Sequence, residues 1–334
     1  MALDVAIDIG TSRTRLATSS QGIIFDEPTL VAIDTNEGTV LSVGANALEL
    51  VGRSPRPVIV YRPLSQGATI DFDVTARMLF GLFHRAGLSK VSRTRVVMSI
   101  PTLATPIERR ALRQAAVQAG AREVSLIEAP LAGAIGLDLP IQEPLGNAVS
   151  VIGGGASEIA IISLGGIVTM DSRRLGGEDI NRTIADAIRH QFGVVVSPAI
   201  IEALKYNLAS VLGATNGKRE VVPGRSVETG SPVEIEVDAS LVNASVMSVM
   251  KANAEMMQEC FRITPPDLSQ DVANLGVSLI GGVAGMKQVG EYLAGQTGVK
   301  TTVAESPDLV IMRGLQLCLE QMGQLHTLFR GRDW

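Results

Sequence analysis

The fold is decided by residues 5–17, which read VAIDIGTSRTRLA, and by residues 149–162, which repeat their design as VSVIGGGASEIAII. Each stretch is an apolar run, a tight turn of small residues and a second apolar run, which is typical of a β-hairpin. Turns rich in backbone amides and hydroxyls are suited to holding a phosphate, here from two sides. The hairpins differ in one acid: Asp8 lies two residues before Gly10, whereas Val151 lies two residues before Gly153.

The composition indicates two domains with aliphatic cores. The chain has 334 residues, of which 46% are hydrophobic and only 3% aromatic. A net charge of −5 without a basic block argues against a nucleic-acid-binding protein. Cys260 and Cys318 make no disulfide framework, and no apolar stretch approaches the ~20 residues of a membrane span. We therefore expect a soluble, cytoplasmic protein.

The two halves of the chain repeat one order of expected elements. After the first hairpin we expect an extended segment near 29–33, helices at 73–86, 106–120 and 131–137, and strands at 95–100 and 124–127. After the second we expect strands at 167–171, 277–280 and 299–303, a small β excursion at 217–237, and helices at 177–192, 198–212, 238–262, from 285 to about 294, and 307–322. This order predicts an α/β duplication with a cleft between the halves.

The first turn is the clearest candidate site. Its members are Asp8, Gly10, Thr11 and Ser12. A carboxylate at the mouth of a phosphate-binding turn can hold the water shell of Mg²⁺, which uses few protein carboxylates. The alternative is an ordinary hairpin that happens to carry an acid near its turn.

The second turn offers amides that can approach a phosphate closely, because glycine carries no side chain. Its members are Gly153, Gly154, Gly155, Ala156 and Ser157. The alternative is a flexible turn without a ligand. Glu158 follows directly and is either a catalytic acid in the cleft or a solvated strand residue.

Two pairs of charged residues are weaker candidates. Arg13 and Arg15 point to one face of their strand, where they either add positive charge near a phosphate or are exposed cations. Glu202 and Lys205 lie three residues apart on one helix face. They either flank a ribose or form a surface ion pair.

A third glycine turn follows a strand in the second half. It begins with Gly281, Gly282 and Val283, and a flat base or ribose can lie against such a backbone. The histidines are scattered and the cysteines are not in ligand spacing, so neither a zinc site nor a Cys/His nucleophile is expected.

Several stretches together resemble the MreB family of bacterial actin homologues. They are residues 8–11, 60–64 with 71–73, 101 with 108–111, 126–136, 161–168, 175–179 and 281–282. The resemblance covers nearly the whole chain and implies the actin-like ATPase fold, with two duplicated α/β domains around a nucleotide cleft. Domain I is expected at 1–144, with a small subdomain at about 33–67 and the C-terminal helix (about 308–334) returning to it. Domain II is expected at 145–307, with a small subdomain at about 180–250.

The resemblance also implies a function. A member of this family binds ATP or ADP with Mg²⁺ between its domains and assembles head to tail into filaments. The filaments lie at the inner membrane face and help to organise cell-wall synthesis and cell shape, together with membrane proteins of the elongation machinery. The basic loop at 87–95 is a candidate lipid contact through Leu88, Val91 and its cations, and a solvated loop is the alternative.

Two departures from the family pattern bear on hydrolysis. The family pattern has an Asp at the position of Val151, and it has Glu-Glu-Pro where this chain has Glu128, Ala129 and Pro130. The position of Ala129 orients the attacking water in that fold. Loss of such a group costs on the order of 10²–10⁴ in rate, by analogy with general acid–base catalysis. We therefore expect nucleotide binding with, at most, weak ATPase activity.

Three functions follow from these residues. The first is a shape-related filament protein for which nucleotide is an assembly ligand. The second is a non-polymerising pseudo-ATPase that serves as a regulatory or scaffold module. The third is an active ATPase or kinase of the same fold, against which Val151 and Ala129 argue because it needs acids in the cleft.

Overall fold

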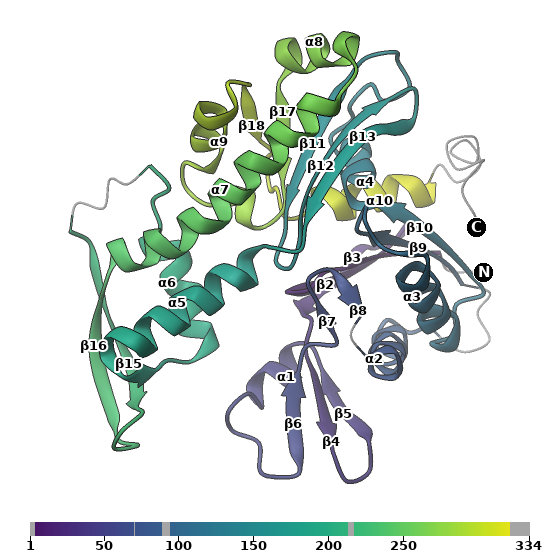
Figure 1. Ribbon diagram of the computed structural model, residues 1–334. Helices are drawn as coiled ribbons and strands as arrows, with labels where there is room; N and C mark the ends of the chain where they lie inside the picture. Colours follow the sequence, from purple (N-terminus) through teal and green to yellow (C-terminus); the bar gives the residue numbers. More distant parts are fainter. Residues whose placement is uncertain (1–3, 70, 89–93, 213–216, 321–334) are drawn as a thin grey trace.

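Two five-stranded sheets of the same design form the framework of the chain (Figure 1). The computed structural model describes residues 4–69, 71–88, 94–212 and 217–320. The first sheet has the order β10-β9-β1-β2-β3 and the second has the order β13-β12-β11-β17-β18. The strands of the first are β1 (Val5–Ile9), β2 (Arg13–Thr18), β3 (Gly22–Pro28), β9 (Arg95–Ile100) and β10 (Glu123–Glu128). Those of the second are β11 (Asn147–Ile152), β12 (Ser157–Ser163), β13 (Gly166–Arg173), β17 (Val277–Ile280) and β18 (Thr301–Val303).

The strand pairing confirms the predicted duplication. In the first sheet β1 is antiparallel to β2 and parallel to β9. In the second sheet β11 is antiparallel to β12 and parallel to β17. Every residue of β11 and β12 is buried, which is expected for strands that are covered on both faces.

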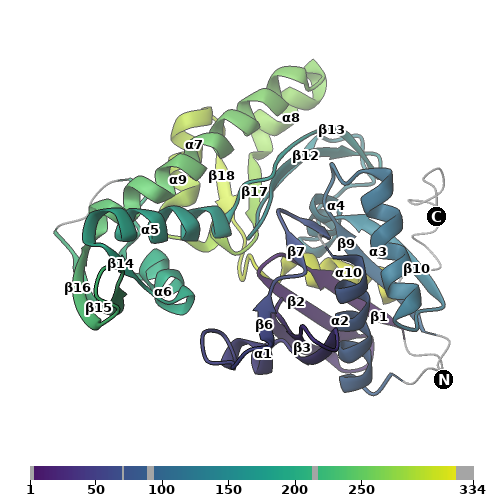
Figure 2. The same cartoon turned by 60° about the horizontal axis from the view of Figure 1, so that its bottom comes forward.

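Each sheet receives one large insertion at the same point of its strand order. The first insertion, between β3 and β9, contains β4 (Val31–Asp34), β5 (Thr39–Val43), α1 (Ala45–Glu49), β6 (Val58–Tyr61), β7 (Leu64–Ser65), β8 (Ala68–Thr69) and α2 (Phe72–Arg85). The second, between β13 and β17, contains α5 (Gly177–Phe192), β14 (Val194–Val195), α6 (Pro198–Leu208), β15 (Arg219–Ser226), β16 (Pro232–Asp238), α7 (Ala239–Ile263) and α8 (Pro266–Leu275). Figures 1 and 2 both place β15, β16 and α6 at the far end of the second half.

The helices begin where the sequence supplies caps. Helix α3 (Pro106–Gln118) starts with a capping box, in which the side chains of Thr105 and Glu108 each accept a hydrogen bond from the other residue's backbone amide. Asp71 caps α2 by accepting a hydrogen bond from Val74 N, and Asp238 caps α7 in the same way through Ser240 N. These local signals explain why the three helices lie close to their predicted ranges.

Helices α4 (Ala129–Gly136) and α10 (Val310–Glu320) pack against each other where the two halves meet (Figure 1). A Cβ at Gly136 would overlap the carbonyl oxygen of Val310, and a Cβ at Gly314 would overlap that of Ala132. Only glycine therefore permits this close approach. Helix α10 also packs on β1 and β9 of the first sheet.

Several local predictions were wrong, for identifiable reasons. The short helices α1 and α8 were not predicted. The helix expected from 285 to about 294 is instead a 3₁₀ turn at Val283–Gly285 followed by α9 (Val289–Thr297). Gln288 adopts a left-handed conformation (φ 64°), which prevents a continuous helix.

The proposed lipid contact at Leu88 does not hold. Leu88 N donates to Phe83 O and Gly87 N donates to His84 O, which is a Schellman motif at the end of α2. The motif directs Leu88 into the hydrophobic core that α2 and α3 form with the first sheet, where it is buried. Residues 89–93 of that loop, and residues 321–334 of the expected C-terminal helix, lie outside the described part of the chain. Among the described residues, no helix combines the length and the apolar character that crossing a membrane requires.

Candidate functional site

The two glycine turns touch each other. The first (Gly10–Ser12) joins β1 to β2, and the second (Gly153–Ala156) joins β11 to β12. A Cβ at Gly154 would overlap Ser12 Oγ, and a Cβ at Gly155 would overlap Thr11 Oγ1. Turns that lie far apart in sequence thus meet tip to tip, and the glycines of the second turn make that contact possible.

Backbone hydrogen bonds fix the first turn. Gly10 N donates to Arg13 O at 3.0 Å, which closes the turn. Thr29, just after β3, donates its hydroxyl to Gly10 O (2.7 Å) and its amide to Ser12 O (2.9 Å). Thr11 Oγ1 accepts from Gly67 N at 3.1 Å. Both hydroxyl-bearing residues of the turn are therefore held in place.

The second turn is fixed to the start of α5. Gly177 N donates to Gly153 O (3.0 Å), and Glu178 N donates to Gly154 O (2.8 Å). A Cβ at Gly176 would lie 2.5 Å from Gly153 O, so no other residue fits there. Ser157, which the sequence placed in the same site, is buried and donates its hydroxyl to Leu175 O.

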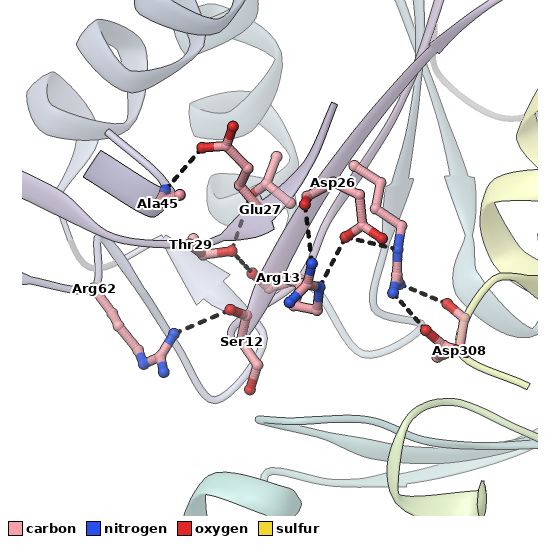
Figure 3. A network of polar contacts seen from close by, with 11 residues as sticks. Ser12, Arg13, Asp26, Glu27, Thr29, Ala45, Arg62 and Asp308 are labelled. Carbon is pink, nitrogen blue, oxygen red and sulfur yellow. Dashed lines mark hydrogen bonds and ion pairs between the residues drawn. The ribbon is translucent and has the colours of Figure 1, made fainter. Parts of the chain in front are cut away.

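Glu178 and Arg62 join the two turns, although neither was predicted as a site residue. Ser12 Oγ donates to Glu178 Oε1 at 2.7 Å, and Arg62 Nη2 lies 3.1 Å from the same oxygen. Arg62 Nη1 also donates to Thr11 O (3.2 Å) and Ser12 O (3.1 Å), and Figure 3 shows the bond to Ser12. Both residues lie in the stretches that carry the family resemblance, which was the only sequence signal for them.

Asp8 lies just below the first turn, beside a buried cation. Its paired residue on β2 is Arg15, so both side chains share one face of the hairpin. Ser99 Oγ donates to Asp8 Oδ1 at 2.7 Å. Burial raises the pKa of the Asp8 carboxyl, and the Ser99 hydrogen bond and the Arg15 charge oppose that rise. The described residues contain no group of three or more His, Cys, Asp or Glu that could hold a metal ion.

Two of the other predicted residues, Lys205 and Val283, meet beside Gly177. Lys205 is buried, and its Nζ lies 2.8 Å from Glu202 Oε2. A Cβ at Gly177 would lie 3.0 Å from Val283 Cγ2 and 3.4 Å from Lys205 Nζ. The residues at 202 and 205 therefore do form an ion pair, in which the lysine is buried and the glutamate is half-exposed. Tyr206, which sequence reasoning missed, donates its hydroxyl to Gly282 O at 3.5 Å.

The arginines of β2 form ion pairs with neighbouring strands and loops (Figure 3). Arg13 Nε donates to Asp26 Oδ1 at 2.8 Å, and its guanidinium is half-exposed. Arg15 is buried and donates to Asp308. Arg15 is thus not an exposed cation.

Residues 2–327 match the family described as MreB/Mbl protein. The chain belongs to the MreB/Mbl family. It is 33% identical to the cell shape-determining protein MreB of Escherichia coli (strain K12) over 325 residues, which cover 96% of this chain and 94% of that protein. It is 32% identical to the cell shape-determining protein Mbl of Bacillus subtilis (strain 168), with 97% of this chain and 98% of that protein covered.

The fold of this MreB/Mbl chain is shared with solved structures. MreB5 of Spiroplasma citri bound to ADP superposes with a TM-score of 0.90 at 24% identity, covering 99% of each chain. The MamK double helical filament superposes with a TM-score of 0.81 at 19% identity, covering 96% of this chain and 99% of that one. The predicted family and the predicted actin-like fold are both confirmed.

Of the two departures from the MreB pattern, Ala129 is the first residue of α4 and is only partly buried. Val151 is buried in the apolar core where the two halves meet. Its paired residue on β12 is Glu158, which is only 2% exposed and so is not a solvated strand residue. Thr102 N donates to Glu158 Oε1 at 3.1 Å, while Oε2 has no hydrogen-bond partner among the described residues. Burial raises the pKa of Glu158 to about 8.

Proposed function

We propose that this MreB/Mbl chain binds ATP or ADP with Mg²⁺ between its two sheets and assembles head to tail into filaments. Nucleotide acts in this proposal as the ligand that controls assembly. Two Spiroplasma citri structures of the same fold hold ADP and AMPPNP, and MamK forms a double helical filament. The curated relatives are cell shape-determining proteins, which supports a role in organising cell-wall synthesis and cell shape.

One observation carries the nucleotide site: both glycine turns and the Lys205 region converge on the first residues of α5. Backbone amides and hydroxyls from two hairpins can take up phosphate charge, and a helix N-terminus adds a favourable dipole. In this proposal Asp8 holds Mg²⁺ through water, which neutralises phosphate charge. The phosphates lie against Gly10, Thr11, Ser12, Arg13, Gly153, Gly154, Gly155 and Ala156, while the buried Ser157 supports the second turn from behind, and the nucleoside lies near Glu202, Lys205, Gly281, Gly282 and Val283. The proposed boundary between the two domains is at residue 144.

Hydrolysis is slow in this proposal because the two positions at which the family pattern carries an acid, 129 and 151, hold apolar side chains here. The side chain of Ala129 has no polar atom, and Val151 is an apolar core residue. Glu158 remains the candidate acid, and because burial raises its pKa to about 8 it is mostly protonated at pH 7, where it can donate a proton. The hydrogen bond from Thr102 N holds the Glu158 side chain in position and does not activate it.

The membrane part of the proposal is peripheral attachment at the inner face, with membrane proteins of the elongation machinery as partners. Liposome co-sedimentation tests it: binding to vesicles with anionic lipid supports the proposal, and recovery of all protein in the supernatant contradicts direct attachment. Because Leu88 belongs to a core, the variants for this test are charge substitutions within 89–95.

Sedimentation and negative-stain microscopy with ATP, ADP or no nucleotide test the assembly proposal. We expect filaments that depend on nucleotide. Nucleotide binding without any polymer would contradict the filament proposal. It would favour the second candidate, a non-polymerising regulatory or scaffold module, which the loss of acids at 129 and 151 also favours.

A further inference from the structure

We infer that Asp308 is a positioning residue of the proposed nucleotide site. It fixes the third glycine turn (residues 281–285) relative to the first (residues 10–12), and so it sets the spacing between the surfaces for the nucleoside and for the phosphates. The inference rests on the proposed function and adds a residue that the sequence did not place in the site. It follows from what the turn at residues 306–309 contacts on each of its sides.

The segment that carries Asp308 is a tight turn between β18 and α10. Leu309 N donates to Ser306 O at 2.9 Å, which closes the turn. Ser306 has a φ of 47°, in the left-handed region that favours glycine. A serine keeps such a conformation only where its surroundings impose it. Contacts with the rest of the molecule, rather than a local preference, therefore determine the path of this turn.

On one side of the turn, Pro307 holds the third glycine turn. Its carbonyl oxygen accepts a hydrogen bond from Gly281 N at 2.7 Å. A Cβ at Gly285 would lie 3.3 Å from Pro307 Cγ, so the proline ring packs on the other end of the same glycine turn. Gly281 also lies against β11, because a Cβ there would lie 2.4 Å from Ile152 O. The third glycine turn is therefore fixed between β11 and Pro307.

On the other side, Asp308 holds the hairpin that carries the first glycine turn. Arg15 of β2 donates to Asp308 O and to Asp308 Oδ2, each at 2.6 Å. Arg13 of the same strand closes the first turn, since its carbonyl oxygen accepts from Gly10 N at 3.0 Å. Asp26 Oδ1 lies 2.8 Å from Arg13 Nε and 3.2 Å from Arg15 Nε, and so it holds the two arginines together.

The two glycine turns are thus linked through neighbouring residues of the chain, Pro307 and Asp308. In the proposed site the nucleoside lies near the third turn and the phosphates lie against the first. A ligand that spans both turns binds best when their spacing is already correct, because ordering the site on binding costs free energy. The side chain of Asp308 is 45% exposed, so a substitution there removes part of the link without opening a core.

Isothermal titration of ADP with Mg²⁺ into the full chain tests this role. Asp308→Ala should weaken ADP binding by about three- to tenfold, as expected for the loss of one charge-assisted hydrogen bond. Asp308→Asn keeps an acceptor for Arg15 and should lose no more than about twofold. The matched control is Val124→Ala on the edge strand β10, which destabilises the core of the first sheet at the edge opposite β3. It should leave ADP affinity within about twofold of wild type.

Adenosine distinguishes a positioning residue from a direct ligand, since it reaches only the nucleoside end of the proposed site. Its affinity is measured by displacement of a fluorescent ADP analogue. Because the third turn keeps its contact with β11, adenosine should bind wild type and Asp308→Ala with affinities within about twofold of each other. Equal losses for adenosine and ADP would make Asp308 a nucleoside ligand and would overturn the inference.

The remaining outcomes separate this inference from the proposed function. If wild type binds no ADP, the proposed function and the inference are both overturned. If wild type binds ADP and Asp308→Ala binds it as tightly or more tightly, only the inference is overturned. A loss in Val124→Ala as large as that in Asp308→Ala has the same meaning. Thermal unfolding checks each variant, and Asp308→Ser, which also removes the carboxylate, takes the place of Asp308→Ala if the alanine variant does not fold.

Discussion

Asp308 accepts two hydrogen bonds from Arg15, one at its backbone oxygen and one at Oδ2, each 2.6 Å long. Arg15 lies on β2, and Asp308 lies in the loop that leads from β18 of the second sheet to α10. Arg15 Nε also lies 3.2 Å from Asp26 Oδ1 on β3. One buried cation thus connects the first sheet to the segment through which the chain returns from the second.

The Arg15–Asp308 pair should respond asymmetrically to substitution. The Arg15 side chain is 7% exposed, whereas that of Asp308 is 45% exposed. Asp308→Ala leaves a buried charge with fewer partners and should lower the free energy of unfolding by about 1.5–3 kcal/mol. Arg15→Met keeps the apolar stem but removes the cation from Asp8 and Asp26 as well as from Asp308, so its effect should be larger. Urea unfolding of both variants measures the two losses of unfolding free energy. Equal losses, or losses in the reverse order, would contradict the predicted asymmetry of the pair.

A second prediction concerns hydrolysis. Ala129→Glu restores a carboxylate at the position that orients water in the family pattern, and residue 129 is only partly buried, so the charge can be accommodated. Phosphate release from Mg²⁺-ATP should rise by about tenfold or more. Ala129→Gln, which has the same size without the charge, should leave the rate near that of wild type. Equal rates for the two variants would show that the missing acid does not limit turnover.

The raised pKa of Glu158 predicts a pH-dependent stability. Because the folded-state pKa is about 8, against 4.5 as the ordinary value, the folded chain binds more protons than the unfolded chain between those two pH values. Stability should therefore fall as pH rises through this window, by at most about 1.4 kcal/mol per pH unit from this residue, and level off above pH 8.

Glu158→Gln keeps the neutral, hydrogen-bonding form at every pH. The difference in unfolding free energy between this variant and wild type should widen from pH 5 to pH 8. Urea titrations at pH 5, 6, 7 and 8 measure that difference directly, and the subtraction removes the contribution of Asp8, whose pKa burial also raises. A constant difference across these pH values would be incompatible with a buried, protonated Glu158.

The glycine contact between α4 and α10 gives a matched pair of substitutions. Gly314→Ala places a methyl group into the carbonyl of Ala132 and should destabilise the chain by about 2–3 kcal/mol. Gly295→Ala, within α9, meets no described atom within 4 Å and should be neutral or stabilise by up to about 1 kcal/mol. Thermal unfolding of both variants tests the contact. Similar effects would mean that the helices can separate at little cost.

The sequence was sufficient for the features that depend on neighbouring residues. The hairpins at 5–17 and 149–162 alternate apolar runs with glycine turns, and this local pattern predicted the duplicated sheets. Caps such as Thr105 and Asp71 are local as well, and α2 and α3 lie near their expected bounds. The local prediction that failed was the continuous helix from 285. Gln288 interrupts it with a left-handed conformation, which few residues other than glycine adopt and which no neighbouring residue signals.

The site was predictable only in part, because long side chains find partners far away in sequence. Arg62 and Glu178 lie on different insertions, and their meeting at Ser12 depends on how the halves pack. Likewise, Glu158 follows a turn that reads as exposed, yet packing against Thr102 buries it. Sequence periodicity shows which face of a strand is apolar, but it does not show what a second domain places over that face.

The contact of Gly154 and Gly155 with Ser12 and Thr11 has a kinetic consequence. Any ligand that binds between the turns must wait for them to part, so encounter and capture are separate steps. At low ligand concentration the observed association rate should rise in proportion to concentration, and at high concentration it should level off at the rate of parting. At high ligand concentration, the rate at which the turns part, rather than the ligand concentration, then limits how fast the chain binds its ligand.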